Sequence, residues 1–214
     1  MGFKANKRDS PEVQLSKTLS YILRHGAAKE GIKVREDGYI RVDDLMAVPK
    51  MQKLNANMDQ IRQIVETNDK KRFRLIEEDG VWYIRANQGH TIKVEVELKP
   101  LESVEDFSTG IAVHGTDERA WDKIRDKGLS RMKRNHIHLA SGKPGDEGVI
   151  SGMRNSSKVF IYIDIEAALK DGIPFFLSEN GVILSPGDST GVIPPKYFLK
   201  VEDRSGNSLI NSSP

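Results

Sequence analysis

Apolar residues in the first seventy positions recur at the spacing of helices. Ser10-Pro11 is a typical cap and first residue of a helix, apolar residues follow at helical spacing as far as Leu23, and Gly26 is expected to end it. The same spacing predicts a short helix over residues 42–48, ended by the proline that follows, and a third helix over residues 58–67.

A hairpin follows these helices. Residues 72–76 and 81–86 are expected to pair across the turn Glu78-Asp79-Gly80. Three helices and a hairpin are the order of a winged-helix domain, which we expect over residues 1–92, and the basic run at residues 70–74 suits a phosphate backbone. Arg85 falls on the row of Val81 and Tyr83, where it either closes the edge of the core or points into a cleft.

The rest of the chain predicts a β-rich domain, so the fold class is α+β. A connector is expected over residues 93–106, the domain over residues 107–203 and a polar tail, too polar to be ordered, over residues 204–214. A helix over residues 117–127 closes at Gly128. Short apolar or alternating runs predict strands at 111–116, 134–140, 159–165, 175–177, 182–184 and 197–201.

Composition narrows the class of protein. The 214 residues, 37% hydrophobic and 30% charged, suffice for one large domain or two small ones. The absence of Cys rules out disulfides and thiolate metal sites and suits the cytoplasm or nucleus. No apolar run approaches the ~20 residues of a membrane span, and the polar N-terminus lacks a signal-peptide core, so no membrane association is expected.

The distribution of charge separates the two halves. Residues 1–90 hold 17 Lys and Arg against 13 Asp and Glu, whereas residues 91–214 hold 16 against 18. A basic front half favours a module that faces nucleic acid, and the alternative is two solvated faces of uneven charge. The two interpretations stay open on charge alone.

Candidate chemistry gathers where Arg and His lie close together. Arg24-His25 and the segment from Arg85 to His90 each combine the two, and Arg154 supplies a further guanidinium. Arg grips phosphate with a planar fork of donors, so a phosphorylated substrate is predicted. His136 and His138 share one side of a strand, but no third ligand stands out and no metal is expected. Glycine-rich nucleotide motifs are missing, and residues 142–148 suggest a mobile loop.

Six motifs in order resemble the tRNA 2′-phosphotransferases. The resemblance extends from Leu15 to about Val201. It implies an N-terminal winged-helix lobe and a C-terminal lobe of ADP-ribosyltransferase type that binds NAD⁺ without a Rossmann fold. The motifs are Leu23-Arg24-His25-Gly26, Arg85-Ala86-Asn87-Gln88-Gly89-His90, His114-Gly115-Thr116, His136-Ile137-His138-Leu139, Gly152-Met153-Arg154 and Asn180-Gly181-Val182.

The resemblance implies an NAD-dependent RNA 2′-phosphotransferase of tRNA splicing. The internal 2′-phosphate of spliced tRNA would attack the nicotinamide ribose of NAD⁺, giving nicotinamide and an RNA-2′-phospho-ADP-ribose intermediate. A second step would release 2′-OH RNA and ADP-ribose 1″,2″-cyclic phosphate. The expected partners are tRNA with an internal 2′-phosphate and NAD⁺ as co-substrate, without a metal, for a protein expected to be a monomer.

Site residues follow from the same resemblance. Arg24, His25, Arg85 and Arg154 correspond to the catalytic tetrad, with the three arginines on the 2′-phosphate. Ala140 stands where many relatives have Ser, so one hydroxyl contact is expected either to be lost or to be supplied by Ser141. The residues expected to bind the dinucleotide are His114, Gly115, Thr116, Leu129, Met132, His138, Leu139 and Ser141.

Three alternatives stay open. Leu129 and Met132, together with Ile124, fit an ordinary hydrophobic core as well as an adenosine pocket. A non-catalytic winged-helix protein that binds nucleic acid would explain the charge but leave Arg85 and Arg154 without a role. An ADP-ribosyltransferase acting on nucleic-acid phosphate ends would use every residue named for the site and differ only in its acceptor.

Overall fold

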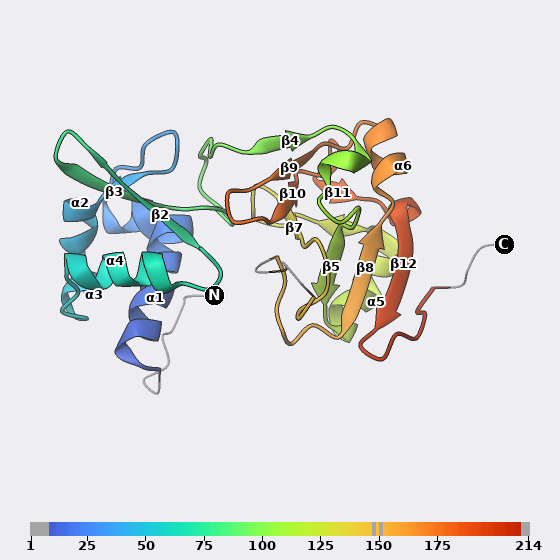
Figure 1. Ribbon diagram of the computed structural model, residues 1–214, viewed down its shortest axis with the longest axis horizontal. Coiled ribbons are helices and arrows are strands. Elements are labelled where there is room, and N and C mark those ends of the chain that lie inside the picture. The colour runs from blue at the N-terminus through green and yellow to red at the C-terminus, as the bar shows by residue number, and fades with distance from the viewer. Residues whose placement is uncertain (1–8, 147–148, 150–151, 211–214) are drawn as a thin grey trace. The chain divides into compact units, whose positions relative to one another are not determined.

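The protein mixes helices and sheets in two compact units, Met1–Glu97 and Leu98–Pro214 (Figure 1). A computed structural model describes residues 9–146, 149 and 152–210. The polar N-terminus, the end of the predicted loop at 142–148 and the last four residues of the predicted tail lie outside the described residues. No helix in the described part of the chain is long and apolar enough to cross a membrane.

The first helix begins where the sequence predicts but does not end at Gly26. In α1 (Pro11–Tyr21), the Ser10 hydroxyl accepts a hydrogen bond from the N–H of Val13 at 3.3 Å. The chain then continues through a π-helical turn, η1 (Ile22–Gly26), and a 3₁₀ turn, η2 (Ala27–Glu30), until Gly31 ends it with φ +72°. Gly26 is needed for space, because a Cβ there would lie 2.6 Å from Cε1 of Tyr21.

Three further helices precede the hairpin, where the sequence predicts two. The second prediction needs correction, because α2 (Val42–Met46) stops early and Pro49 begins a new helix, α3 (Pro49–Gln52). Proline suits a first helical position, where its missing N–H costs nothing. The third prediction is confirmed by α4 (Met58–Thr67), which a capping box between Asn57 and Gln60 starts.

The predicted hairpin is confirmed and forms a three-stranded sheet of order β1-β3-β2. Its strands are β1 (Ile40–Arg41), β2 (Phe73–Glu78) and β3 (Val81–Ala86), and Asp79 and Gly80 turn the hairpin with φ of +50° and +76°. Ile84 and Ala86 belong to the core between this sheet and the helices. Arg85 alternates with them and therefore faces the other side of the sheet.

The second unit combines several small antiparallel sheets. A four-stranded sheet has the order β4-β9-β10-β7, and a three-stranded sheet has the order β12-β8-β5. A bridge between Val113 and Ala140 ties the two sheets together. The strands are β4 (Lys99–Leu101), β5 (Val113–Thr116), β6 (Leu129–Ser130), β7 (Ile137–Leu139), β8 (Val159–Ile163), β9 (Phe175–Leu177), β10 (Ile183–Ser185), β11 (Val192–Ile193) and β12 (Phe198–Asp203).

Among the described residues, two helices and two 3₁₀ turns complete this unit. Asp117 caps α5 (Glu118–Lys127), and Gly128 follows it with φ +83°, as predicted. The predicted strand at 159–165 ends early because Asp164 caps α6 (Ile165–Lys170), a helix that the sequence pattern did not reveal. The turns are η3 (Val104–Asp106) and η4 (Pro195–Tyr197). The main core lies on one face of β8, which contributes Val159, Ile161 and Ile163.

Two segments differ from the predicted domain organisation, namely the expected connector and the expected tail. Within the expected connector, residues 99–101 form β4 and pair with β9. Residues 204–210 of the expected tail fold back on β12, where the Leu209 N–H donates to the carbonyl oxygen of Val201 at 2.8 Å. The partners of β4 lie far away in the sequence, and residues 204–210 lack the alternation of a strand. Local composition therefore does not reveal either contact.

Candidate functional site

Arg24 and His25 lie in the π-helical turn η1. Single π turns inside helices occur frequently at functional sites, because the wider turn redirects the side chains that it carries. The guanidinium of Arg24 packs against Gly89, where a Cβ would approach Nε to 3.4 Å. Gly89 also has φ +87°, so its position favours glycine for its backbone as well as for its space.

The segment that follows β3 is bonded to this turn. The N–H of Thr91 donates to the carbonyl oxygen of Arg24 at 3.0 Å, and the Thr91 hydroxyl lies 3.0 Å from Nδ1 of His25. Two motifs more than sixty residues apart are thereby neighbours within the first unit. Sequence reasoning did not single out Thr91, which carried no pattern of its own.

Arg85 is buried, with only 3% of its surface exposed. Its guanidinium carbon lies 4.8 Å from the ring centre of Tyr39, and Nη1 donates to the carbonyl oxygen of Asp37 at 3.3 Å. A cation over an aromatic face is attracted by the ring. The loop before β1 therefore covers Arg85 on the sheet face opposite the core, and the side chain is held in a defined position.

Asn87 fixes the chain two residues beyond Arg85. Its N–H donates to the carbonyl oxygen of Arg72 at 2.9 Å, and its side-chain amide donates to the carbonyl oxygen of Lys71 at 2.8 Å. Lys71 has φ +41°, an uncommon backbone conformation for a residue other than glycine. Asn87 is a positioning contact that the motif contained but that sequence reasoning did not assign.

In the second unit, β5 and β7 bring His114 and His138 together. Nδ1 of His114 lies 2.9 Å from the carbonyl oxygen of His138, so Nδ1 carries the proton and donates. Surrounding protein atoms lower the pKa of His114, against the opposing effect of that hydrogen bond, and the nearby Arg134 lowers it further. The ring is neutral at pH 7 and keeps Nε2 as an acceptor.

The segment that carries Arg154 packs directly on these strands. A Cβ on Gly115 would lie 2.6 Å from the hydroxyl oxygen of Ser157 and 2.8 Å from the sulfur of Met153. At the other end Gly152, with φ +114°, is so close to Ala140 that a Cβ would meet its methyl carbon at 2.7 Å. Glycine at both positions lets the segment approach the strands.

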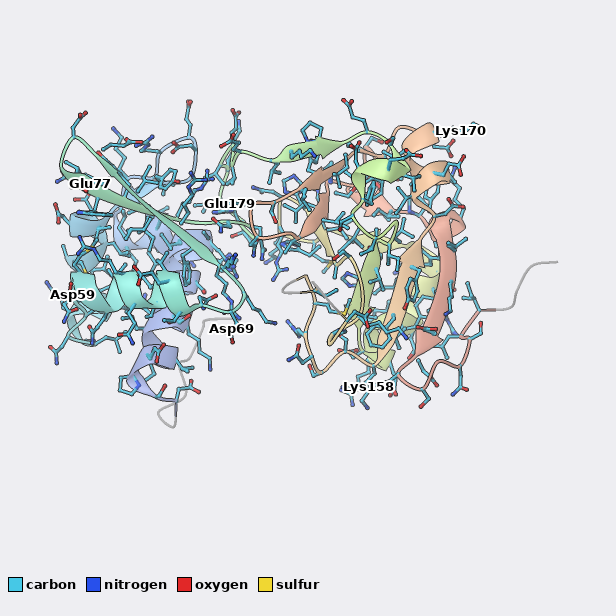
Figure 2. All side chains as sticks on the ribbon, in the orientation of Figure 1. Asp59, Asp69, Glu77, Lys158, Lys170 and Glu179 are labelled. Carbon is cyan, nitrogen blue, oxygen red and sulfur yellow. The ribbon has the colours of Figure 1, made fainter. Side chains whose placement is uncertain are left out.

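Further contacts hold the end of this segment. The N–H of Lys158, a residue labelled in Figure 2, donates to the carbonyl oxygen of Thr116 at 2.8 Å. Arg154 itself is exposed. Surrounding protein atoms lower the pKa of Arg134, and the charge of Arg154 lowers it further, which places two cations near each other. Such a pair suits an anionic ligand.

The residues predicted to bind the dinucleotide differ in their exposure to solvent. His114, Gly115, Thr116 and His138 are partly exposed. Leu129 and Leu139 belong to the main core, as the alternative interpretation of Leu129 held, whereas Met132 is 79% exposed with φ +54°. Ser141 is partly exposed, and its carbonyl oxygen accepts a hydrogen bond from the Thr109 hydroxyl at 2.6 Å.

Comparison with known proteins gives the family. The sequence profile of the RNA 2′-phosphotransferase, Tpt1 / KptA family matches residues 10–187. The chain belongs to this family. Within the described residues, no group of three or more His, Asp or Glu side chains is arranged to hold a metal ion.

Curated relatives of the family come from distant organisms. The tRNA 2′-phosphotransferase 1 of Danio rerio is 46% identical over 197 residues, which are 91% of this chain and 87% of the relative. The tRNA 2′-phosphotransferase 1 of Bos taurus is 50% identical over 87% of this chain and 74% of its own length. The tRNA 2′-phosphotransferase of Saccharomyces cerevisiae is 38% identical over 91% and 85%.

Proposed function

We propose that this protein transfers the internal 2′-phosphate of spliced tRNA to NAD⁺, giving 2′-OH RNA, nicotinamide and ADP-ribose 1″,2″-cyclic phosphate. The observation that supports it most is the family match across residues 10–187. We further propose that the first unit is a winged-helix lobe and the second an ADP-ribosyltransferase-like lobe, as the resemblance in the sequence implies.

The chemistry of the second unit fits a dinucleotide. His114 offers a neutral acceptor nitrogen and Thr116 offers a hydroxyl, and both are partly exposed on β5 beside the backbone of Gly115. These groups suit the amide and the ribose hydroxyls of NAD⁺. Arg134 and Arg154 supply positive charge for phosphate oxygens nearby. NAD⁺ itself supplies an anomeric carbon with a stable leaving group.

The arginines suit the other substrate. A 2′-phosphate is a dianion and a nucleophile already, so the protein needs to hold and aim it more than to deprotonate it. Arg85, fixed by Tyr39 and Asp37, and Arg24, fixed against Gly89, provide positioned guanidiniums in the first unit. Positioned cations also stabilise the charge that builds on phosphorus when the phosphate is transferred.

One assay separates this function from its alternatives. The protein is mixed with NAD⁺ and an RNA that carries one internal 2′-phosphate, and the products are identified by mass. Loss of the phosphate together with release of nicotinamide and the cyclic phosphate supports the proposal. Absence of nicotinamide release would favour a non-catalytic nucleic-acid-binding protein, and stable ADP-ribose on a terminal phosphate would favour modification of nucleic-acid ends.

A further inference from the structure

A buried carboxylate lies on the sheet that supports the Arg154 segment. Glu202 of β12 is only 2% exposed. Its carboxylate accepts a hydrogen bond from the Tyr162 hydroxyl at 2.9 Å and forms ion pairs with Lys143 and Lys200. Burial favours the protonated form, but the hydrogen bonds from these partners lower the pKa of Glu202 to about 2. Glu202 is therefore a fixed negative charge at neutral pH.

Lys143 belongs to the chain that leaves β7 and leads to Arg154. We call the described residues 141–146, 149 and 152–157 the cover segment. Val149 and Met153 of this segment pack with Phe160 and Val113 on the sheet face opposite the main core. The ammonium of Lys143 lies 5.4 Å from the ring centre of Phe160. Lys143 thus passes over β8 to reach Glu202 on β12.

The cover segment is held at both ends. Beyond Ala140, the carboxylate of Asp146 accepts a hydrogen bond from the N–H of Lys143 at 2.7 Å, which shapes the first turn before the ion pair with Glu202. At the far end, Met153 and Ser157 pack against Gly115. Arg154 lies between those last two contacts, so its position depends on where the whole segment rests on the sheet.

We propose that Glu202 is a positioning residue for Arg154, which acts by holding Lys143 and with it the cover segment against the sheet. The effect of Glu202 on catalysis rests on the proposed function, because it presupposes that Arg154 takes part in that reaction. A buried carboxylate is costly to desolvate even when it is paired with partly exposed lysines, so we explain the ion pair with Lys143 by the position that it specifies. Glu202 does not itself need to touch either substrate.

The chain offers a closely matched control. Lys143 and Lys200 each form an ion pair with Glu202, and each ammonium lies over an aromatic ring of β8, at 5.4 Å from Phe160 and 5.3 Å from Tyr162. Lys200 lies on β12 itself, outside the cover segment. Lys143→Met and Lys200→Met therefore remove the same charge and the same kind of contact, and only the first releases the cover segment.

The first measurement is steady-state kinetics of the full chain with NAD⁺ and the 2′-phosphorylated RNA. Lys143→Met is expected to lower kcat by ~10-fold or more, because small displacements of a positioning group have large effects on rate. Lys200→Met is expected to stay within about twofold of the wild type, because surface charges away from the reaction have small effects. The two melting temperatures should fall by similar amounts, since Glu202 loses one partner in each variant.

The second measurement does not depend on activity. Within residues 141–157 the only basic residues are Lys143 and Arg154, and Lys143 precedes Pro144. Trypsin does not readily cleave before proline, so Lys143→Met removes no effective cleavage site from the segment. Cleavage after Arg154 under native conditions should become several-fold faster in Lys143→Met and stay unchanged in Lys200→Met, because a released segment opens more often.

The outcomes distinguish a failure of the positioning role of Glu202 from a failure of the proposed function. Equal kcat values and equal cleavage rates for the two variants would overturn the positioning role, whatever the protein catalyses. Failure of the wild type to remove the 2′-phosphate would overturn the proposed function instead, and the cleavage comparison would still test the attachment of the cover segment. Faster cleavage without a lower kcat would show that the attachment exists but does not position a catalytic group.

Discussion

At the scale of single residues, the environment of Arg85 explains how a buried cation can serve a reaction. Its planar group lies over Tyr39 and donates to the Asp37 carbonyl, so its direction is set before any substrate arrives. A group that is already oriented loses little entropy when it binds an anion. The same contacts imply that Arg85 also contributes to stability, and its two roles have to be separated by a control.

Arg35 supplies that control. Its guanidinium lies over both Tyr39 and Tyr83, at 5.5 and 5.0 Å, and pairs with Asp37 and Glu78. We predict that Arg85→Gln lowers kcat for 2′-phosphate removal by ~100-fold or more, in the range found when a donor to developing charge is deleted. Arg35→Gln should lower the melting temperature by a similar amount but leave kcat within a few-fold of the wild type. A stable Arg85→Gln protein with full activity would return Arg85 to a structural role.

At the scale of elements, the sequence predicted the helices and turns that are determined by neighbouring residues. The helices over residues 58–67 and 117–127 and the turn at Asp79-Gly80 were predicted, and in the structure a capping box starts α4 and Asp117 caps α5. The strands β1, β4, β6 and β11 have two or three residues each and exist because of partners far away in the chain. Periodicity over so few residues carries no signal.

The candidate site shows the same division. The motifs identified Arg24, Arg85 and Arg154 as candidates, and the structure supplies contacts that hold Arg24 and Arg85 and the segment that carries Arg154. The π turn at Ile22–Gly26 was missed because Gly26 resembles a helix stop and its actual role is to make room for Tyr21. Glu202 was missed because a carboxylate in an alternating strand is usually exposed, and its partner Lys143 lies far away in the sequence.

Gly115 tests the packing of the Arg154 segment on β5. Its backbone is not left-handed, so the cost of a Gly115→Ala substitution arises from the Cβ that would press on Ser157 and Met153 at 2.6 and 2.8 Å. We expect kcat to fall by ~10-fold through displacement of Arg154. Gly172→Ala is the matched control, since φ is +83° there and nothing lies within 4 Å. It should cost ~1 kcal/mol of stability through its backbone and leave activity unchanged.

At the scale of the whole chain, acidic pH should act on the second unit through Glu202. Its pKa in the folded protein is about 2, below the ordinary value of 4.5. A lowered pKa stabilises the folded state above the ordinary value, and this contribution is lost as the pH falls from about 4.5 towards 2. We predict a loss on the order of 2 kcal/mol over that window, measured by denaturant unfolding at a series of pH values.

A variant isolates this contribution from that of other carboxylates. Glu202→Gln cannot ionise, so the slope of its unfolding free energy between pH 4.5 and 2 should be smaller than that of the wild type. Asp188→Asn provides a comparison at a partly exposed carboxylate whose pKa is lowered by hydrogen bonds from Thr190. An unchanged slope in Glu202→Gln would show that the carboxylate is not held as a buried anion.

The two units supply different arginines, and kinetics can show whether one reaction uses both. Arg85 lies in the first unit and Arg154 in the second. If the two arginines act as a unit in one step, each single substitution to Gln already removes most of the rate that the pair contributes, and the double variant should be little slower than the slower single variant. Two residues that stabilise the same transition state independently of each other would instead give losses that multiply. Single-turnover rates at saturating NAD⁺ make this comparison, and fully multiplicative losses would contradict action of the two arginines as a unit.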